Sequence, residues 1–366
     1  MEKLIYGLNL QRFAAGDNET SSQTAMNVNK TTSNGMKAEI LDYYNSELLR
    51  NTKDNFVYNQ FAKHATIPQG NGGNIKWRRM IPYKAATTPL TEGVTPAGNT
   101  ALFEDISAET NEYGDYTVIT DLVKMETFDP MVIEISAAHA EQAALTIDTL
   151  TRNEIMTGTQ KFLAPTWSGS TPTEVLVRED LDITSKLTLD LMSSAETLLK
   201  KNKAKKINGS YIAVIHPDIE DDVRTDKENF IDVVKYNNAE KIYEGEIGKW
   251  YGVKIIVNNN AKVWRDDTCP ANPDAPETGG EDYEQYLAVY GIVVFGLDAY
   301  ADVKLTDGDI KMLIKQVGSS GVDDPLDQRG SIGWKIPAFA TKILNELHIV
   351  RIECTSPKHS KYELPN

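Results

Sequence analysis

The chain has 366 residues, of which 40% are hydrophobic and 25% are charged, so it is long enough for two or more cores and has the composition of a globular protein. Its longest uncharged apolar run, Tyr286 to Leu297, is much shorter than the roughly 20 residues of a membrane-spanning helix, and its first residues are too polar for a secretory signal. The net charge of -15 argues against a protein that condenses nucleic acid. The two cysteines, Cys269 and Cys354, lack CxxC spacing and indicate neither a disulfide scaffold nor a metal site.

The N-terminal region divides into a polar segment and a helical one. Residues from Gly16 to Gly35 are polar and poor in aromatic side chains, so they cannot bury enough apolar area to fold in isolation. This segment is either a simple tail or an arm that a neighbouring subunit orders. From Met36 to Lys63 apolar residues recur at helical spacing and predict a helix.

The region from Gly70 to Thr127 predicts a long hairpin. Two strand-like segments, Ile75–Ile81 and Tyr113–Met125, are separated by about thirty residues rich in Thr, Pro, Gly and Glu. A structureless connection of that length is unusual inside a compact domain. We therefore expect an arm that binds another chain by strand addition.

Two helices are expected in the middle of the chain. Pro130 at a first-turn position, with Asp129 as the N-cap, predicts a long helix that ends near Met156. A second, amphipathic helix is predicted from Thr184 to Lys203, and Phe162–Glu174 is predicted to be a loop. The buried face of the long helix is expected to contain Ile133, Ala137, Ala140, Ala144, Ile147 and Leu150.

The second helix ends in a cluster of lysines, which contains Lys200, Lys201, Lys203, Lys205 and Lys206. Cations are favourable at a helix C-terminus because they interact with the helix dipole. A nucleic-acid patch is the alternative, and the absence of interleaved aromatic residues argues against it.

The remaining elements predict an α+β fold rather than a doubly wound sheet, because strands alternate with helices and hairpins. A Pro-, Gly- and acid-rich insertion, Arg265–Gln285, is expected on the surface. His216-Pro217-Asp218 is expected to open a short helix. Strands are predicted at Tyr211–Ile215, Trp250–Val257, Tyr286–Phe295 and Ile310–Lys315.

The segment from Gly318 to Cys354 has the pattern of a chain end that neighbours hold. A GSSG hinge leads to Asp323-Asp324-Pro325-Leu326-Asp327, then to a glycine pair, Gly330 and Gly333. From Glu346 to Cys354, apolar and polar residues alternate as in a strand.

No residue pattern predicts catalysis, a cofactor or a metal ion. His216 and Asp218 are two residues apart, but a helix cap and a packed histidine explain them better than a general base or a ligand pair. The five histidines lack zinc spacing, and the glycines match no phosphate-binding pattern. The aspartates at 323–327 lack the EF-hand spacing, so a hydrogen-bonded turn is the better interpretation.

Four segments together carry a resemblance. They are HPD at His216, GEIGKWYGVKII from Gly245, VVFGLDAY from Val293 and the ending described above. In this order they resemble the N4-gp56-like family of bacteriophage major capsid proteins over Lys37 to Glu353. The resemblance implies an HK97-type capsid fold with an N-terminal arm, an extended β-hairpin loop, a long spine helix, and peripheral and axial subdomains.

The resemblance also implies a division of the chain into five parts. These are an arm with a helix (1–64), the extended loop with flanking strands (65–128), the spine helix with part of the peripheral domain (129–180), an axial-type α/β domain (181–317), and a C-terminal return strand and tail (318–366).

The implied function is structural: a major capsid protein whose hexamers and pentamers form an icosahedral or prolate shell around the double-stranded DNA of a tailed bacteriophage. The implied partners are other copies of the chain, a separate scaffolding protein, a portal and a decoration protein, with no membrane and no sequence-specific DNA binding. Assembly is expected in the host cytoplasm and the mature protein in the virion. Subunit contacts are expected at Trp77, Arg78, Arg79, Lys84, Leu90, Phe103, Asp324, Pro325 and Arg329.

Three alternatives remain at this point. An encapsulin-like nanocompartment shell that packages enzyme cargo shares the fold. A soluble enzyme of unknown class is another alternative for the function of the whole chain. Some shells of this fold are also crosslinked through a lysine of the extended loop, for which Lys84 is the candidate, with Glu92 or Glu104 as base, but nothing in the sequence selects a partner asparagine.

Overall fold

The computed structural model describes residues 57–68, 70, 72–96, 98–121, 131–225, 230–232, 246–250, 252–273, 275, 282–306, 308–318, 324–361 and 363–366. The polar arm, most of the helix expected over Met36–Lys63, and Asp129 lie outside these residues. The described end of the expected helix is different: a short 3-10 turn, η3 (Asn59–Phe61), leads into strand β1 (Lys63–Ile67). β1 is extended because it pairs in parallel with β14 (Tyr300–Leu305).

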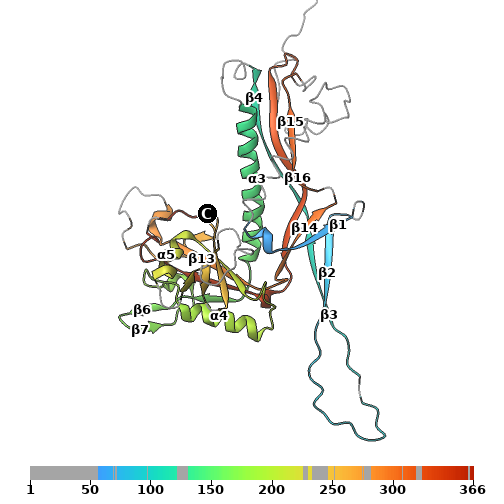
Figure 1. Ribbon diagram of the computed structural model, residues 1–366, viewed down its shortest axis with the longest axis vertical. Helices are drawn as coiled ribbons and strands as arrows, with labels where there is room; N and C mark the ends of the chain where they lie inside the picture. The colour runs from blue at the N-terminus through green and yellow to red at the C-terminus, as the bar shows by residue number, and fades with distance from the viewer. Residues whose placement is uncertain are drawn as a thin grey trace, which may run out of the picture.

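The subunit consists of a compact body, a tall helix-and-sheet unit beside it, and a loop that extends away from both (Figure 1). The tall unit contains helix α3 (Met131–Ile155) and a five-stranded sheet. The compact body contains an eight-stranded sheet. The expected α+β class is confirmed, with helices and strands in both units.

Strand β16 (Arg329–Ile343) organises the five-stranded sheet. Its first half pairs antiparallel with β15 (Lys311–Lys315) on one edge and with β4 (Asn111–Thr120) on the other. Its second half pairs antiparallel with β14, and β14 pairs with β1. One long strand therefore links β4, from an early part of the chain, with β14 and β15, which shortly precede it in the sequence.

Helix α3 covers one face of this sheet. Its small and aliphatic side chains, among them Ala140, Ala143 and Ile147, pack on Trp334 and Phe339 of β16. Short alanine side chains allow the helix to approach the sheet closely. The expected buried face is confirmed at Ala140, Ala144 and Ile147, whereas Ile133 is exposed. The expected helix boundaries, Pro130 to Met156, agree with α3 to within one residue.

The eight-stranded sheet has both faces buried. Its order is β5 (Lys161–Leu163), β17 (Ile349–Cys354), β13 (Val289–Phe295), β8 (Tyr211–Ile215), β11 (Val253–Val257), β10 (Glu246–Trp250) and β9 (Phe230–Asp232), with β12 (Val263–Trp264) paired to β13. Helix α4 (Leu189–Lys201) and helix α5 (Pro217–Thr225) cover one face. The end of α3 and the turn at Tyr58 cover the other. Burial on both faces explains the continuous apolar sequences of β8 and β13.

Several expectations about local structure are wrong. The hairpin partner of β2 (Asn74–Met80) is β3 (Phe103–Glu109), not the strand expected over Tyr113–Met125, because that part of the chain forms β4 and pairs with β16. The segment Phe162–Glu174 is not a loop, since it contributes to β5 and forms the small hairpin of β6 (Thr166–Ser168) and β7 (Thr171–Thr173).

Two further boundaries differ. Helix α4 starts at Leu189, since Thr188 is its N-cap and accepts the Leu191 N–H. The expected surface insertion, Arg265–Gln285, is buried at Arg265 and Cys269. Arg265 is held by three carbonyl oxygens, those of Tyr286, Lys361 and Glu363.

The C-terminal segment does not depend on neighbouring subunits for its strand pairing. Two of its parts, β16 and β17, are paired with strands of the same subunit in the two sheets. Sheet membership also departs from the expected division of the chain: β14 and β15 lie within the expected axial part, 181–317, but belong to the sheet of β4 and β16. None of the described helices is both long and apolar enough to cross a membrane.

We expect Gly333→Ala to destabilise the subunit by roughly 1–3 kcal/mol, the usual effect of overpacking. A Cβ at this position would lie 2.5 Å from the Asp115 carbonyl oxygen and 2.6 Å from the Tyr116 Cβ, so β4 and β16 could not keep their spacing. Urea unfolding of the unassembled subunit measures the effect. Gly98→Ala is the control, since nothing lies within 4 Å of a Cβ there; equal stability of the two variants would contradict the prediction.

Candidate assembly surfaces

The hairpin of β2 and β3 carries a loop, residues 81–102, that projects away from both units of the subunit (Figure 1). All the described residues of this loop are exposed. At its base Ile81 N donates to Leu102 O, at 2.9 Å. The loop therefore contributes little to the core of its own subunit.

Two ion pairs cross the hairpin next to the loop. Arg78 Nε lies 2.9 Å from Asp105 Oδ1, and Arg79 Nη2 lies 2.5 Å from Glu104 Oε2. The hydrogen bond from Arg78 lowers the pKa of Asp105 below its usual range. Exposed pairs of this kind add little stability, but opposite charges at paired positions favour one strand register.

Large apolar side chains on the loop and hairpin face solvent. Leu90 is 78% exposed and Phe103 is 56% exposed, and Ile81, Tyr83, Val94 and Leu102 are exposed with them. Single exposed apolar residues are ordinary, but several on one projecting segment indicate a binding surface.

The nine residues expected at subunit contacts do not form one patch. Trp77 is half-buried, because it packs with Ile67 and Val303 of its own subunit. Arg79 is also half-buried. Asp324 is buried. The fully exposed members are Arg78, Lys84, Leu90, Phe103, Pro325 and Arg329.

Asp324 forms a turn at the start of β16. Its Oδ2 accepts the Arg329 N–H at 2.6 Å, and its carbonyl oxygen accepts the Asp327 N–H at 3.0 Å. The interpretation of these aspartates as a hydrogen-bonded turn is confirmed at Asp324. Leu326, at the tip of this turn, is 74% exposed.

The face of the five-stranded sheet opposite α3 carries a second exposed apolar surface, which the sequence analysis missed. Tyr116 and Leu313 are both paired with Gly333 in the strands on either side of it, and Val118 is one pleat away from Tyr116. All three side chains are exposed. Alternation in Asn111–Thr120 was the available signal, since Tyr113 and Ile119 lie on one face and Tyr116 and Val118 on the other.

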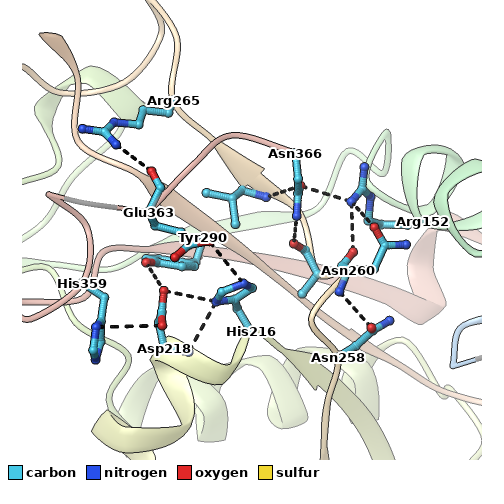
Figure 2. Close-up of polar contacts among 12 residues, drawn as sticks. Arg152, His216, Asp218, Asn258, Asn260, Arg265, Tyr290, His359, Glu363 and Asn366 are labelled. Carbon is cyan, nitrogen blue, oxygen red and sulfur yellow. Dashed lines mark hydrogen bonds and ion pairs between the residues drawn. The ribbon is translucent and has the colours of Figure 1, made fainter. Parts of the chain in front are cut away.

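A buried polar network joins α3 to the compact body, and Figure 2 shows the part of it that contains Arg152, Asn258 and Asn260. Asp148 accepts the N–H groups of Val57 and Tyr58 and the side-chain amides of Asn258 and Asn260. Burial raises the pKa of Asp148, and these hydrogen bonds oppose the rise. All four groups that donate to Asp148 lie outside α3. The network therefore fixes the position of the helix relative to these segments.

Arg152, one turn further along α3, extends the network to the C-terminal residues. Its Nη1 donates to Asn260 Oδ1 at 2.8 Å and to Asn366 Oδ1 at 3.1 Å. The amide of Asn366 also accepts the Val263 N–H and donates to the Ala261 carbonyl oxygen. Burial lowers the pKa of Arg152, opposed by the nearby Tyr58 and Asp148.

A second polar cluster lies where β8 meets α5 (Figure 2). Asp218 Oδ2 accepts the Tyr290 hydroxyl at 2.6 Å and lies 3.3 Å from His216 Nδ1. Burial lowers the pKa of His216 and raises the pKa of Tyr290. Burial and the neighbouring Asp218 raise the pKa of Glu363. Glu363 and His359 could not be placed beside His216 from the sequence, because they are more than a hundred residues away along the chain.

Two of the five lysines in the cluster at the end of α4 pair with one acidic side chain. Lys200 and Lys206 both pair with Glu196, at 2.8 and 3.3 Å. Burial disfavours ionisation of Glu196, but the hydrogen bonds from both lysines outweigh it and lower its pKa. This pairing favours the structural interpretation of the cluster.

Comparison with known proteins identifies the family. The sequence profile of the family described as phage capsid protein matches residues 103–352, more than half of the chain. The chain belongs to this phage capsid protein family. A search of curated proteins gave no match.

This capsid protein has the HK97-type fold. The capsid of Ralstonia phage GP4 is 12% identical, with a TM-score of 0.59 over 86% of this chain and 92% of that chain. The capsid of cyanophage P-SCSP1u is 15% identical, with a TM-score of 0.56 over 82% of this chain and 88% of that chain. The mature capsid of bacteriophage PhiM1 is 13% identical, with a TM-score of 0.54 over 81% of this chain and 86% of that chain.

As a major capsid protein the chain assembles with its own copies into a shell, and its location is the virion capsid. Its role is structural. The encapsulin alternative has less support, since the matching family is described as phage capsid protein.

We expect Leu90→Asp to block shell assembly while leaving the subunit folded, because Leu90 is exposed on the projecting loop and a charge there opposes apolar contact with another copy. Thr88→Asp is the matched control, since it adds the same charge at a polar position of the same loop. Light scattering and electron microscopy measure assembly, and the melting temperature checks the fold. Normal shells from Leu90→Asp would exclude an apolar role for this side chain.

We expect Asp148→Asn to lower the free energy of unfolding by about 1–3 kcal/mol, because each carboxylate oxygen accepts two hydrogen bonds and an amide NH2 in place of either oxygen cannot accept them. Urea unfolding measures the loss. Asp180→Asn makes the same chemical change at an exposed position and should have no effect. Equal behaviour of the two variants would show that the network is not required for stability.

Proposed function

We propose that this capsid protein forms the hexamers and pentamers of an icosahedral or prolate shell that encloses the double-stranded DNA genome of a tailed bacteriophage. The observation that carries this proposal is the projecting loop, residues 81–102, with exposed Leu90 and Val94. An isolated subunit gains nothing from ordering such a loop. Contact with an adjacent copy buries its apolar side chains and uses its unpaired main chain.

The two apolar surfaces support a head-to-tail arrangement of subunits. The loop and the exposed sheet face at Tyr116, Val118 and Leu313 are different in shape and lie on different elements. Contacts between unlike surfaces are heterologous and close into rings when the rotation allows it. Hexamers and pentamers are rings of this type.

Within this proposal the exposed residues among the nine candidates are contacts between subunits. Arg78, Lys84 and Phe103 belong to the hairpin and loop, and Pro325 and Arg329 belong to the turn that precedes β16. Trp77 and Arg79 stiffen the base of the loop, and Asp324 shapes the turn.

The finer assignments are part of the same proposal. The four quoted segments support membership of the N4-gp56-like family. We assign the unit of α3 and the five-stranded sheet as the peripheral subdomain and the unit of the eight-stranded sheet as the axial subdomain. A separate scaffolding protein, a portal and a decoration protein are the proposed partners, with assembly in the host cytoplasm. The net charge of -15 suits a shell that contains DNA without binding it tightly.

Deletion of residues 85–99 tests the proposed function. We expect the shortened protein to fold with an unchanged melting temperature, because the deleted residues are exposed, and to remain unassembled in electron micrographs. Replacement of the same residues by a Gly/Ser sequence of equal length separates the effect of loop length from that of its side chains. Shells of normal appearance from the deletion variant would exclude the proposed role of the loop.

A further inference from the structure

Three segments of the chain bring metal-ligating side chains together on the compact body (Figure 2). His216 follows β8, Asp218 lies in the first turn of α5, and Glu363 lies near the end of the C-terminal segment. Each offers one ligand atom such that the three atoms lie within 4.8 Å of one another. His359 lies beside them, with its Nδ1 3.9 Å from Asp218 Oδ1.

Two separations in this cluster, from His216 to Glu363 and from His359 to Asp218, are too long for direct hydrogen bonds and fit a shared ion. His216 Nε2 lies 3.9 Å from Glu363 Oε1, the same separation as between His359 and Asp218. A direct N–H···O bond is at most about 3.2 Å long. Two atoms bound to one ion at about 2.0–2.2 Å lie roughly 3–4 Å apart.

The surrounding contacts orient the ligands for this purpose. His216 is 7% exposed, and its Nδ1 lies 3.3 Å from Asp218 Oδ2. His216 Nδ1 also accepts the Asp218 N–H at 3.3 Å, which places the imidazole proton on Nε2. An ion bound at Nε2 therefore displaces that proton to Nδ1, where Asp218 Oδ2 is the acceptor at 3.3 Å. Tyr290 donates to the same Asp218 oxygen at 2.6 Å and leaves Oδ1 for other contacts. A carboxylate that orients a histidine is common around bound metal ions.

The two carboxylates also lack a cation of their own. Among the described residues, the ion pairs of Asp218 and Glu363 involve only the two histidines. The nearest arginine, Arg265, donates to the Glu363 carbonyl oxygen rather than to its carboxylate, and Lys358 pairs with Asp221. Adjacent carboxylates without a cation repel each other, and a divalent ion relieves that repulsion.

We propose that His216, Asp218 and Glu363 bind a divalent transition-metal ion, with His359 as a fourth donor, and that this ion fastens the C-terminal segment to the compact body. Imidazole and carboxylate donors favour Zn²⁺ over Mg²⁺ or Ca²⁺, which prefer oxygen ligands alone. Two arginines attach the same segment to the subunit as well. Arg265 holds the carbonyl oxygens of residues 361 and 363, and Arg152 holds Asn366.

The test uses the full-length protein after dialysis against EDTA and then against chelator-free buffer. We expect calorimetry to measure one Zn²⁺ bound per chain. Trypsin cleavage after Lys358 and Lys361, followed by mass spectrometry, reports whether the segment is fastened. If Zn²⁺ binds only the fastened form, free Zn²⁺ at 100 times its Kd should slow this cleavage roughly 100-fold.

Glu363→Gln should abolish both effects while leaving the metal-free melting temperature unchanged, because Glu363 is only partly buried. His64→Ala is the control. His64 Nδ1 lies 2.6 Å from Asp302 Oδ1, which is the distance of a direct hydrogen bond. Removal of this imidazole should therefore leave Zn²⁺ binding unchanged. The proposal is overturned if the wild type does not bind Zn²⁺, if Glu363→Gln binds it equally, or if only acidic pH fastens the segment, since a shared proton would then replace the ion.

Discussion

The pairing of β16 is the constraint on which the rest of the subunit depends. This strand pairs with β4 and β15 along its first half and with β14 along its second half, and α3 packs across it. Because β4 and α3 come from a part of the sequence far from β16, the strand fixes the base of the loop and the long helix relative to each other. Gly333 makes the closest approach possible, since a side chain there would collide with β4.

The core of the compact body is covered within the subunit, whereas the loop and one face of the five-stranded sheet are exposed. The core of the compact body is closed on both faces, by α4 and α5 on one side and by α3 with Tyr58 on the other. The loop at residues 81–102 and the outer sheet face at Tyr116 have no such cover. Under the proposed function, assembly uses these exposed surfaces, while the sheets of the subunit are already paired within it.

The joint between the two units combines apolar packing at the end of α3 with a buried polar network. Asp148 and Arg152 on α3 bind amides and main-chain groups from three other segments, so the angle of the helix is set by directional hydrogen bonds. A buried network of this kind is costly if one partner is lost, which favours a single arrangement of the two units. In a shell, where many copies must match, a fixed angle keeps the contact surfaces in register.

The sequence by itself determined the α+β class, the ends of α3, the strands β8, β11, β13 and β17 of the compact body and the phage capsid family, because helical and strand periodicities and short segments are local properties. Only the tertiary structure decided which strands pair. The expected partner of β2 was wrong, and β16 was interpreted as a hinge and glycine pair, since pairing of distant strands leaves no local signal. The same holds for side chains. Leu90 on the loop could be chosen from its local context, whereas Tyr116, Asp148 and the meeting of His216 with Glu363 depend on which face or segment the fold places beside them.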